Sequence, residues 1–329
     1  MNRRQILHGV AVLVAWVGVA GVGVVMLSQA AGWNGGALTA TLQSLTPYGI
    51  PVVLASAAFG VWKREDSLAT VGALVALGAF ALSIPLVVPP GQPAPTPESI
   101  RTSVASVNLL YSNPVVDEVA DELVDLDPDV IVFSEYTPAH RDALLAHPLA
   151  DRYRYQVNRD ERRSSGMAVW SRYPLDAMPA GTDRTVDTEV SAPDGPIRLL
   201  GVHPPTPVFD FDLWEGELRR IGETAADSAL PTLVIGDFNA SYWHPAFRDL
   251  LARDLTDAHV ANGSGWSTSW PSDRSLPPFV RLDHALTGNG LVSTDVDDFR
   301  VPGSDHIGLI VTVAPSTPAT DEPGPDASG

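Results

Sequence analysis

The sequence predicts an α/β domain preceded by a membrane region of three transmembrane helices. The first 90 of its 329 residues contain three long apolar stretches. The later part alternates short apolar segments typical of strands with amphipathic segments typical of helices. Polar residues (Asn, Asp, Glu and His) recur at or near the ends of these expected strands, where loops can converge on a functional site.

Four regions follow from this pattern. We expect a membrane region over 1–90, a proline-rich linker over 91–100, a catalytic domain over 101–313 and a disordered tail over 314–329. The prolines of the linker predict an extended polyproline spacer that holds the catalytic domain a short distance off the membrane.

The three apolar stretches are each long enough to cross about 30 Å of hydrocarbon. They run from Ile6 to Leu27, from Leu42 to Trp62 and from Leu68 to Val88. The second is the weakest candidate because Pro47 and Pro51 lie near its start. Three consecutive spans explain this region better than three buried helices of a soluble protein.

Basic residues indicate how the spans are oriented. Arg3 and Arg4 precede the first stretch, and Lys63 and Arg64 follow the second. The positive-inside bias places both sites in the cytoplasm. We therefore expect a multi-pass protein of the cell membrane with a cytoplasmic N-terminus and an extracytoplasmic catalytic domain. The paired arginines also resemble a twin-arginine signal, but the apolar run is long for a signal peptide, so we favour an uncleaved span.

The composition restricts the chemistry of the later part. The chain has no cysteine, which excludes disulfides and thiolate metal sites. Beyond residue 90 it carries 17 basic and 37 acidic residues, a net charge of −20. A body this acidic repels polyanions, so a phosphate substrate would need a local cation.

Expected strands and helices alternate through the catalytic domain. We expect strands over 102–110, 129–133, 166–175, 197–202, 230–235, 280–286 and 307–313, and helices over 115–126, 138–146 and 212–227.

The strongest motif follows the strand over 230–235. There Gly236 precedes Asp237 and Asn239, which are separated by Phe238. In an extended backbone Asp237 and Asn239 project to one side while Phe238 turns into the core. A carboxylate can accept a proton or hold a cation, and an amide can orient water or a phosphate oxygen. An Asx-rich turn is the structural alternative.

Other polar groups lie at or near further strand ends, and each has an ordinary structural explanation. Asn108 could cap a helix, Glu135 could be a surface carboxylate, and His203 could stack in a proline-rich turn. Asp283 could pair with Arg281 or cap a turn, and Asp305 and His306 could lie in an exposed loop. His284 follows Asp283, and strand alternation directs it to the opposite face.

Taken together, the order of these motifs resembles the endonuclease/exonuclease/phosphatase superfamily over about residues 100–313. This group includes deoxyribonuclease I, exonuclease III-type abasic-site endonucleases, inositol polyphosphate 5-phosphatases and neutral sphingomyelinases. The resemblance implies a four-layer α/β sandwich, with two packed mixed β-sheets flanked by helices, and metal-dependent hydrolysis of a P–O bond. The layout also resembles the membrane-anchored bacterial proteins of the VanJ type.

The resemblance implies a Mg²⁺ site, with Mn²⁺ as a substitute. Glu135 would be the main ligand, because Mg²⁺ prefers carboxylate and water oxygens. Asn108 would lie in the same shell or contact the phosphate, and Asp305 would orient the site or supply a second ligand. Leu110 stands where abasic-site enzymes carry an acidic ligand, which argues against that subgroup.

The remaining roles are also implied by the resemblance. Asp237 would accept the proton of the attacking water, and Asn239 would orient that water or a phosphate oxygen. Asp283 would hydrogen-bond His306 and favour its cationic form, which stabilises the charged transition state. His203 would contact the phosphate or protonate the leaving group.

A basic island precedes the strand over 166–175. Arg162 and Arg163 are candidate substrate contacts in a domain that is otherwise acidic, and a solvated loop is the equal alternative.

Three functions compete on this basis. The favoured one is a membrane-tethered phosphoesterase acting on a lipid-linked or cell-envelope phosphate. The second is an extracytoplasmic nuclease. The sequence shows no stripe of aromatic and basic residues for nucleic acid, and three spans are an unusual anchor for an enzyme whose substrate diffuses freely. The third is an inactive phosphate-binding protein, which predicts damaged catalytic positions that the sequence lacks. The oligomeric state does not follow from the sequence.

Overall fold

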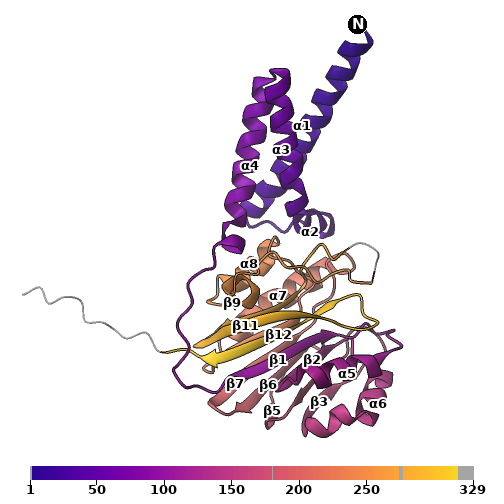
Figure 1. Cartoon of the computed structure of the whole chain (residues 1–329), viewed down its shortest axis with the longest axis vertical. Coiled ribbons are helices and arrows are strands. Elements are labelled where there is room, and N and C mark those ends of the chain that lie inside the picture. Colours follow the sequence, from indigo (N-terminus) through magenta and orange to yellow (C-terminus); the bar gives the residue numbers. More distant parts are fainter. Residues whose placement is uncertain (1, 180, 274–276, 318–329) are drawn as a thin grey trace, which may run out of the picture.

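The computed structural model describes residues 2–179, 181–273 and 277–317. A helical region stands on an α/β domain, and the chain passes between them along one side of the domain (Figure 1). Most of the predicted tail, from residue 318 onward, lies outside the described residues.

The helical region has two clear membrane-crossing candidates rather than three. Its helices are α1 (Arg3–Ala30), α2 (Ala37–Ser44), α3 (Thr46–Lys63) and α4 (Asp66–Val87). By length and composition α1 and α4 qualify alone, whereas α2 and α3 qualify only as a pair bent by 67°. Of the three expected spans, the structure thus shows two, and the third is present only if the bent pair crosses the membrane as one span. The break coincides with Pro47 in the first turn of α3, where proline lacks the N–H that would continue a preceding helix.

The helices pack on a small core and leave apolar side chains outside. Val19, Val53 and Leu68 are fully buried between α1, α3 and α4. Leu13 and Leu77 are more than 60% exposed, as are several other large apolar side chains of these helices. Such an apolar outer surface is typical of helices that face lipid rather than water.

The α/β domain contains two six-stranded sheets. The first has the order β11-β12-β1-β2-β4-β3 and the second the order β5-β6-β7-β8-β10-β9. The strands of the first sheet are β1 (Thr102–Asn108), β2 (Val130–Ser134), β3 (Tyr155–Arg159), β4 (Met167–Ser171), β11 (Leu291–Arg300) and β12 (Ile307–Pro315). Those of the second are β5 (Leu175–Ala177), β6 (Thr185–Ala192), β7 (Gly195–Val202), β8 (Thr232–Asp237), β9 (Thr256–Asp257) and β10 (Asp283–Gly288).

Helices cover the outer face of each sheet. The helices α5 (Val116–Leu126) and α6 (Pro138–Ala146), with the 3-10 helix Pro148–Arg152, pack on the first sheet. The helices α7 (Phe211–Ala226) and α8 (Pro245–Leu251) pack on the second, and the short α9 (Ala258–Ala261) follows β9.

Strand alternation explains why β2 is apolar along almost its whole length. Val130 and Val132 of β2 face the second sheet, whereas Ile131 and Phe133 face the helices. A strand buried on both faces carries no polar stripe. The two mixed sheets and their flanking helices confirm the expected four-layer sandwich.

Several boundaries differ from expectation. The strand expected over 166–175 is two strands in different sheets, because the turn at Pro174 separates β4 from β5. The strands β3, β6, β9 and β11 and the helices α8 and α9 were not predicted, since their segments lack clear periodicity. The last strand extends to Pro315, two residues into the predicted tail.

The linker does not act as a free spacer. The N–H of Thr96 donates to the carbonyl of Pro315, and the side chain of Gln92 donates to the carbonyl of Ser293. The helical region instead contacts the α/β domain directly, because Gln29 donates to the carbonyl of Trp243 and His244 bonds the carbonyl of Ala40. The proline content predicted a spacer that keeps the α/β domain away from the membrane helices. This prediction is wrong, because polar contacts between distant segments hold the two parts together.

Gly236 lets β7 and β8 approach closely beside the strand-end cluster. Its φ is 148°, and a Cβ at this position would lie 2.1 Å from the carbonyl oxygen of Val202. We expect Gly236→Ala to lower the free energy of unfolding by about 3 kcal/mol, because the backbone of β7 must move. Gly216→Ala in α7 meets no atom within 4 Å and should instead gain up to about 1 kcal/mol. Urea unfolding of both variants checks this, and equal stabilities would contradict it.

Candidate active site

Six polar residues meet at one edge of the sandwich because of strand direction. The pairs β1–β2 and β7–β8 are parallel, so their carboxyl ends lie at the same edge of their sheets. The antiparallel strands β10 and β12 begin at that edge. The six residues brought together are Asn108, Glu135, His203, Asp237, Asp283 and His306.

Asp237 is the centre of this group and is almost fully buried. Its Oδ2 accepts a hydrogen bond of 3.0 Å from Asn108 Nδ2, and the Nε2 atoms of His203 and His306 lie 3.5 and 3.7 Å from the same oxygen. The N–H of Asn239 donates to Oδ1 at 2.8 Å. Burial would raise the pKa of Asp237, but His306 and His203 hold this pKa down at about 2. The carboxylate is therefore ionised at neutral pH.

His306 is paired with Asp283 across the two sheets. Its Nδ1 lies 2.8 Å from Asp283 Oδ2, and Ser269 Oγ accepts from the N–H of Asp283. Burial lowers the pKa of His306, but the carboxylates of Asp283 and Asp237 outweigh this and raise it to about 10. The expected hydrogen bond between Asp283 and His306 is confirmed, and Nε2 of the cation faces Asp237.

Glu135 is the most accessible carboxylate of the group, with 13% of its side chain exposed. Its φ of 55° places it in the left-handed region, which is uncommon for a residue other than glycine and recurs at functional sites. Oε2 accepts from the N–H of Tyr111 at 2.8 Å. Among the described residues Oε1 accepts no hydrogen bond and lies 4.0 Å from His203 Nε2.

This donor set fits a divalent cation. Asp237, Asp283 and His306 offer ligand atoms within 4.8 Å of one another and could hold a metal. A protonated His306 cannot ligate a metal, however, so the free oxygen of Glu135 is the better donor. The three carboxylates also exceed the single positive charge of His306, and a hard cation with oxygen ligands would offset that excess when a phosphate binds.

Other predicted residues are placed less directly. One N–H of Asn239 Nδ2 donates to the carbonyl of Pro204, which leaves the second N–H for a phosphate oxygen and Oδ1 for water. The carboxylate of Asp305 accepts from the indole of Trp270, so its role as a ligand stays a prediction.

Arg162 and Arg163 are exposed on the β3–β4 loop and make no hydrogen bond or ion pair among the described residues. The base of this loop is attached beside Glu135, because the N–H of Tyr136 donates to the carbonyl of Gly166. Substrate contact by the two arginines also stays a prediction.

Sequence reasoning missed residues that hold the site together. Ser304 Oγ donates to the carbonyl of Asn108 and accepts from the N–H of His306, which joins β1 to the start of β12. Its place directly before the Asp-His pair was the available signal. His284 faces away from the site, as strand alternation predicts, and forms a buried pair with Asp257 at 2.6 Å.

Comparison with known proteins assigns the family. The profile of the Endonuclease/Exonuclease/phosphatase family matches residues 105–306, more than half of the chain. The chain belongs to this family. The resemblance seen in the motifs is thus confirmed at the level of the family, and hydrolase chemistry on phosphate esters follows from it. The VanJ-type subgroup is not confirmed. No curated protein matches the sequence significantly.

Solved structures share the fold at low sequence identity. D. rerio TDP2 complexed with a single-strand DNA product is 14% identical, with a TM-score of 0.55 over 65% of this chain and 98% of that chain. An AP endonuclease from Archaeoglobus fulgidus is 14% identical, with a TM-score of 0.52 over 64% and 98%. An endonuclease/exonuclease/phosphatase from Beutenbergia cavernae is 18% identical, with a TM-score of 0.50 over 66% and 72%.

Proposed function

We propose that this family member is a membrane-anchored, Mg²⁺-dependent phosphoesterase that hydrolyses a lipid-linked or cell-envelope phosphate. One observation carries the proposal. An ionised Asp237, a cationic His306 and an accessible Glu135 meet at one sheet edge, on a domain that docks directly onto apolar helices.

The contacts of these residues support the following roles. Asp237 would accept the proton of the attacking water, with the amide of Asn239 orienting that water or a phosphate oxygen. His306, held cationic by Asp283, would stabilise the charge that develops on the phosphoryl oxygens. His203 would protonate the leaving group.

Glu135 and Asn108 would hold the Mg²⁺, for which Mn²⁺ could substitute. The bound ion would supply positive charge beside the phosphate in a domain that is strongly acidic.

The placement of the basic residues supports an extracytoplasmic domain. Arg3 and Arg4 begin α1, and Lys63 ends α3 with Arg64 directly after it. Both sites lie at the end of the helical region away from the α/β domain (Figure 1). The positive-inside bias would then put this domain outside the cytoplasm.

A substrate screen tests the proposal. In the presence of Mg²⁺, detergent-solubilised protein should release phosphate or a phosphorylated headgroup from lipid phosphates. Addition of EDTA should abolish this release. Inactivity toward a broad panel of lipid phosphates would reject the lipid-linked substrate. Plasmid nicking abolished by Asp237→Ala would favour the nuclease alternative, whereas binding without turnover of any phosphate ester would favour the inactive binding protein.

Replacing Glu135 with Gln tests the metal site. We expect the Mg²⁺ concentration for half-maximal activity to rise about 10- to 100-fold, because an amide is a weaker ligand than a carboxylate for a hard cation. The same titration on Asp305→Asn measures its contribution separately. An unchanged Mg²⁺ dependence in Glu135→Gln would exclude it as the main ligand.

A further inference from the structure

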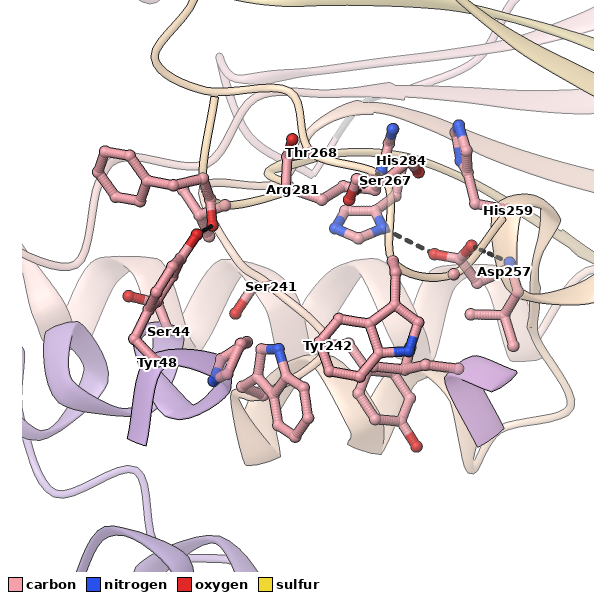
Figure 2. A pocket seen from close by; sticks show the side chains of 18 residues that line it. Ser44, Tyr48, Ser241, Tyr242, Asp257, His259, Ser267, Thr268, Arg281 and His284 are labelled. Carbon is pink, nitrogen blue, oxygen red and sulfur yellow. Dashed lines mark hydrogen bonds and ion pairs between the residues drawn. The ribbon is translucent and has the colours of Figure 1, made fainter. Parts of the chain in front are cut away.

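A cavity of about 290 Å³ lies between the helical region and the α/β domain (Figure 2). One wall comes from the bend between α2 and α3, with Ser44 and Tyr48, and from Leu86 near the end of α4. The other wall comes from loops of the α/β domain, with Tyr242 and Trp266. None of the six clustered catalytic and metal-site candidates lines it, so it is a separate site.

The cavity lies where the helices would leave the hydrocarbon of a membrane. The end of α1, the start of α3 and the end of α4 all face the α/β domain (Figure 1). Large apolar side chains next to the lining residues are exposed, namely Leu45 at 37%, Val87 at 60% and Val88 at 61%. The cavity therefore continues an apolar outer surface at the depth of lipid headgroups and ester groups.

The charged side chains that line the cavity are already paired within the protein. Asp257 is paired with His284, and Arg281 donates to Asp298 at 2.6 Å. The serine and threonine hydroxyls of the lining are bonded to backbone or side-chain atoms as well, and they belong to Ser44, Ser241, Ser267 and Thr268. A charged ligand would thus find no free counter-charge among the described residues.

The polar groups of the lining that stay free in the described part of the chain are the buried Nδ1 of His259 and three hydrogen-bond donors on Tyr and Trp rings. The hydroxyl of Tyr242 and the indole N–H groups of Trp243 and Trp266 make no hydrogen bond among the described residues. Rings with an apolar body and a polar tip suit the membrane interface, where hydrocarbon meets ester carbonyls. The lining therefore matches a ligand with an apolar chain and uncharged acceptors.

We propose that this cavity binds one phospholipid of the surrounding bilayer through the upper, ester-linked part of an acyl chain. The lipid would bridge the helical region and the α/β domain without being turned over. This inference rests on the membrane placement proposed above but not on the catalytic activity. Carbonate extraction of membranes tests the placement separately.

Native mass spectrometry of the detergent-purified full chain tests the lipid site with two probes, phosphatidylglycerol and phosphatidylcholine. We expect the wild type to bind one copy of either lipid with similar affinity, because no charge in the lining is free. Ser44→Trp fills the cavity from the helical wall and should weaken binding by about tenfold or more. Ser267→Trp fills it from the opposite wall and should have the same effect, so a folding defect in one variant does not decide the result.

The controls separate this site from general lipid contact. Thr41→Trp lies in the same helix as Ser44 but is exposed and outside the cavity, so it should bind lipid like the wild type. Asp237→Asn should also bind normally, because the site is not catalytic. The proposal would be overturned if all variants bound lipid equally or if the protein strongly preferred one headgroup. Retention of an isoprenoid phosphate in place of phospholipid would also overturn it.

Discussion

Replacing Asp237 by Asn is expected to lower kcat/KM for phosphate ester hydrolysis by about 10³-fold at saturating Mg²⁺. The amide keeps the shape of the side chain and can still accept from the N–H of Asn239. It cannot take a proton from water, and it removes the charge that faces His203 and His306. Loss of one group therefore affects both proton transfer and the electrostatics of the site.

Asp295→Asn is a matched control for this experiment. Asp295 is exposed on β11, outside the cluster at the sheet edge, and its replacement changes the net charge equally. We expect wild-type activity from it, measured with mono- and diester substrates beside the lipid phosphates. If Asp237→Asn retained more than about a tenth of wild-type activity, proton acceptance by Asp237 would be ruled out.

Asp283→Asn is expected to lower activity about 10²-fold and to move the alkaline limb of the pH profile to lower pH. In the wild type Asp283 and Asp237 raise the pKa of His306 to about 10, so the cation persists through neutral pH and is lost only as the pH rises through that value. Without the charge of Asp283, His306 loses its proton at lower pH. Activity that depends on the cation then falls earlier.

The pH profile of kcat/KM measured from pH 6 to 10.5 checks this prediction. The limb should shift by at least about one pH unit in Asp283→Asn, because the asparagine removes a full charge at hydrogen-bond distance. Asp298→Asn is the control, because the carboxylate of Asp298 pairs with Arg281 and His259 and not with His306. The alkaline limb of its pH profile should not shift. An unmoved limb in Asp283→Asn would mean that His306 is not the titrating group.

Local sequence patterns predicted much of the α/β domain. The helix expected over 138–146 has those bounds in the structure, where Thr137 caps its start and Pro138 is its first residue. Apolar runs such as Leu233 to Ile235 identified buried strands. Strands with mixed polarity were missed, and the segment over 166–175 was taken as one strand although its two halves belong to different sheets.

The membrane region shows the limit of composition as a guide. Apolar length identified α1 and α4, but it did not reveal the bend between α2 and α3 or the docking of the helices on the α/β domain. That docking depends on single polar contacts such as the one from Gln29 to Trp243, which are 214 positions apart. No local pattern encodes such a pair.

The sequence by itself identified the candidate side chains of the site and indicated that each stands at or near a strand end. Alternation along a strand is a local property, so it separated Asp283 from His284 correctly. Only the tertiary structure decided which strand ends meet, because parallel pairing and the stacking of two sheets join Asn108 to Asp237 and His306 to Asp283. It also decided that Asp305 turns toward Trp270, since the position of a side chain in a loop depends on the partners that packing brings within reach.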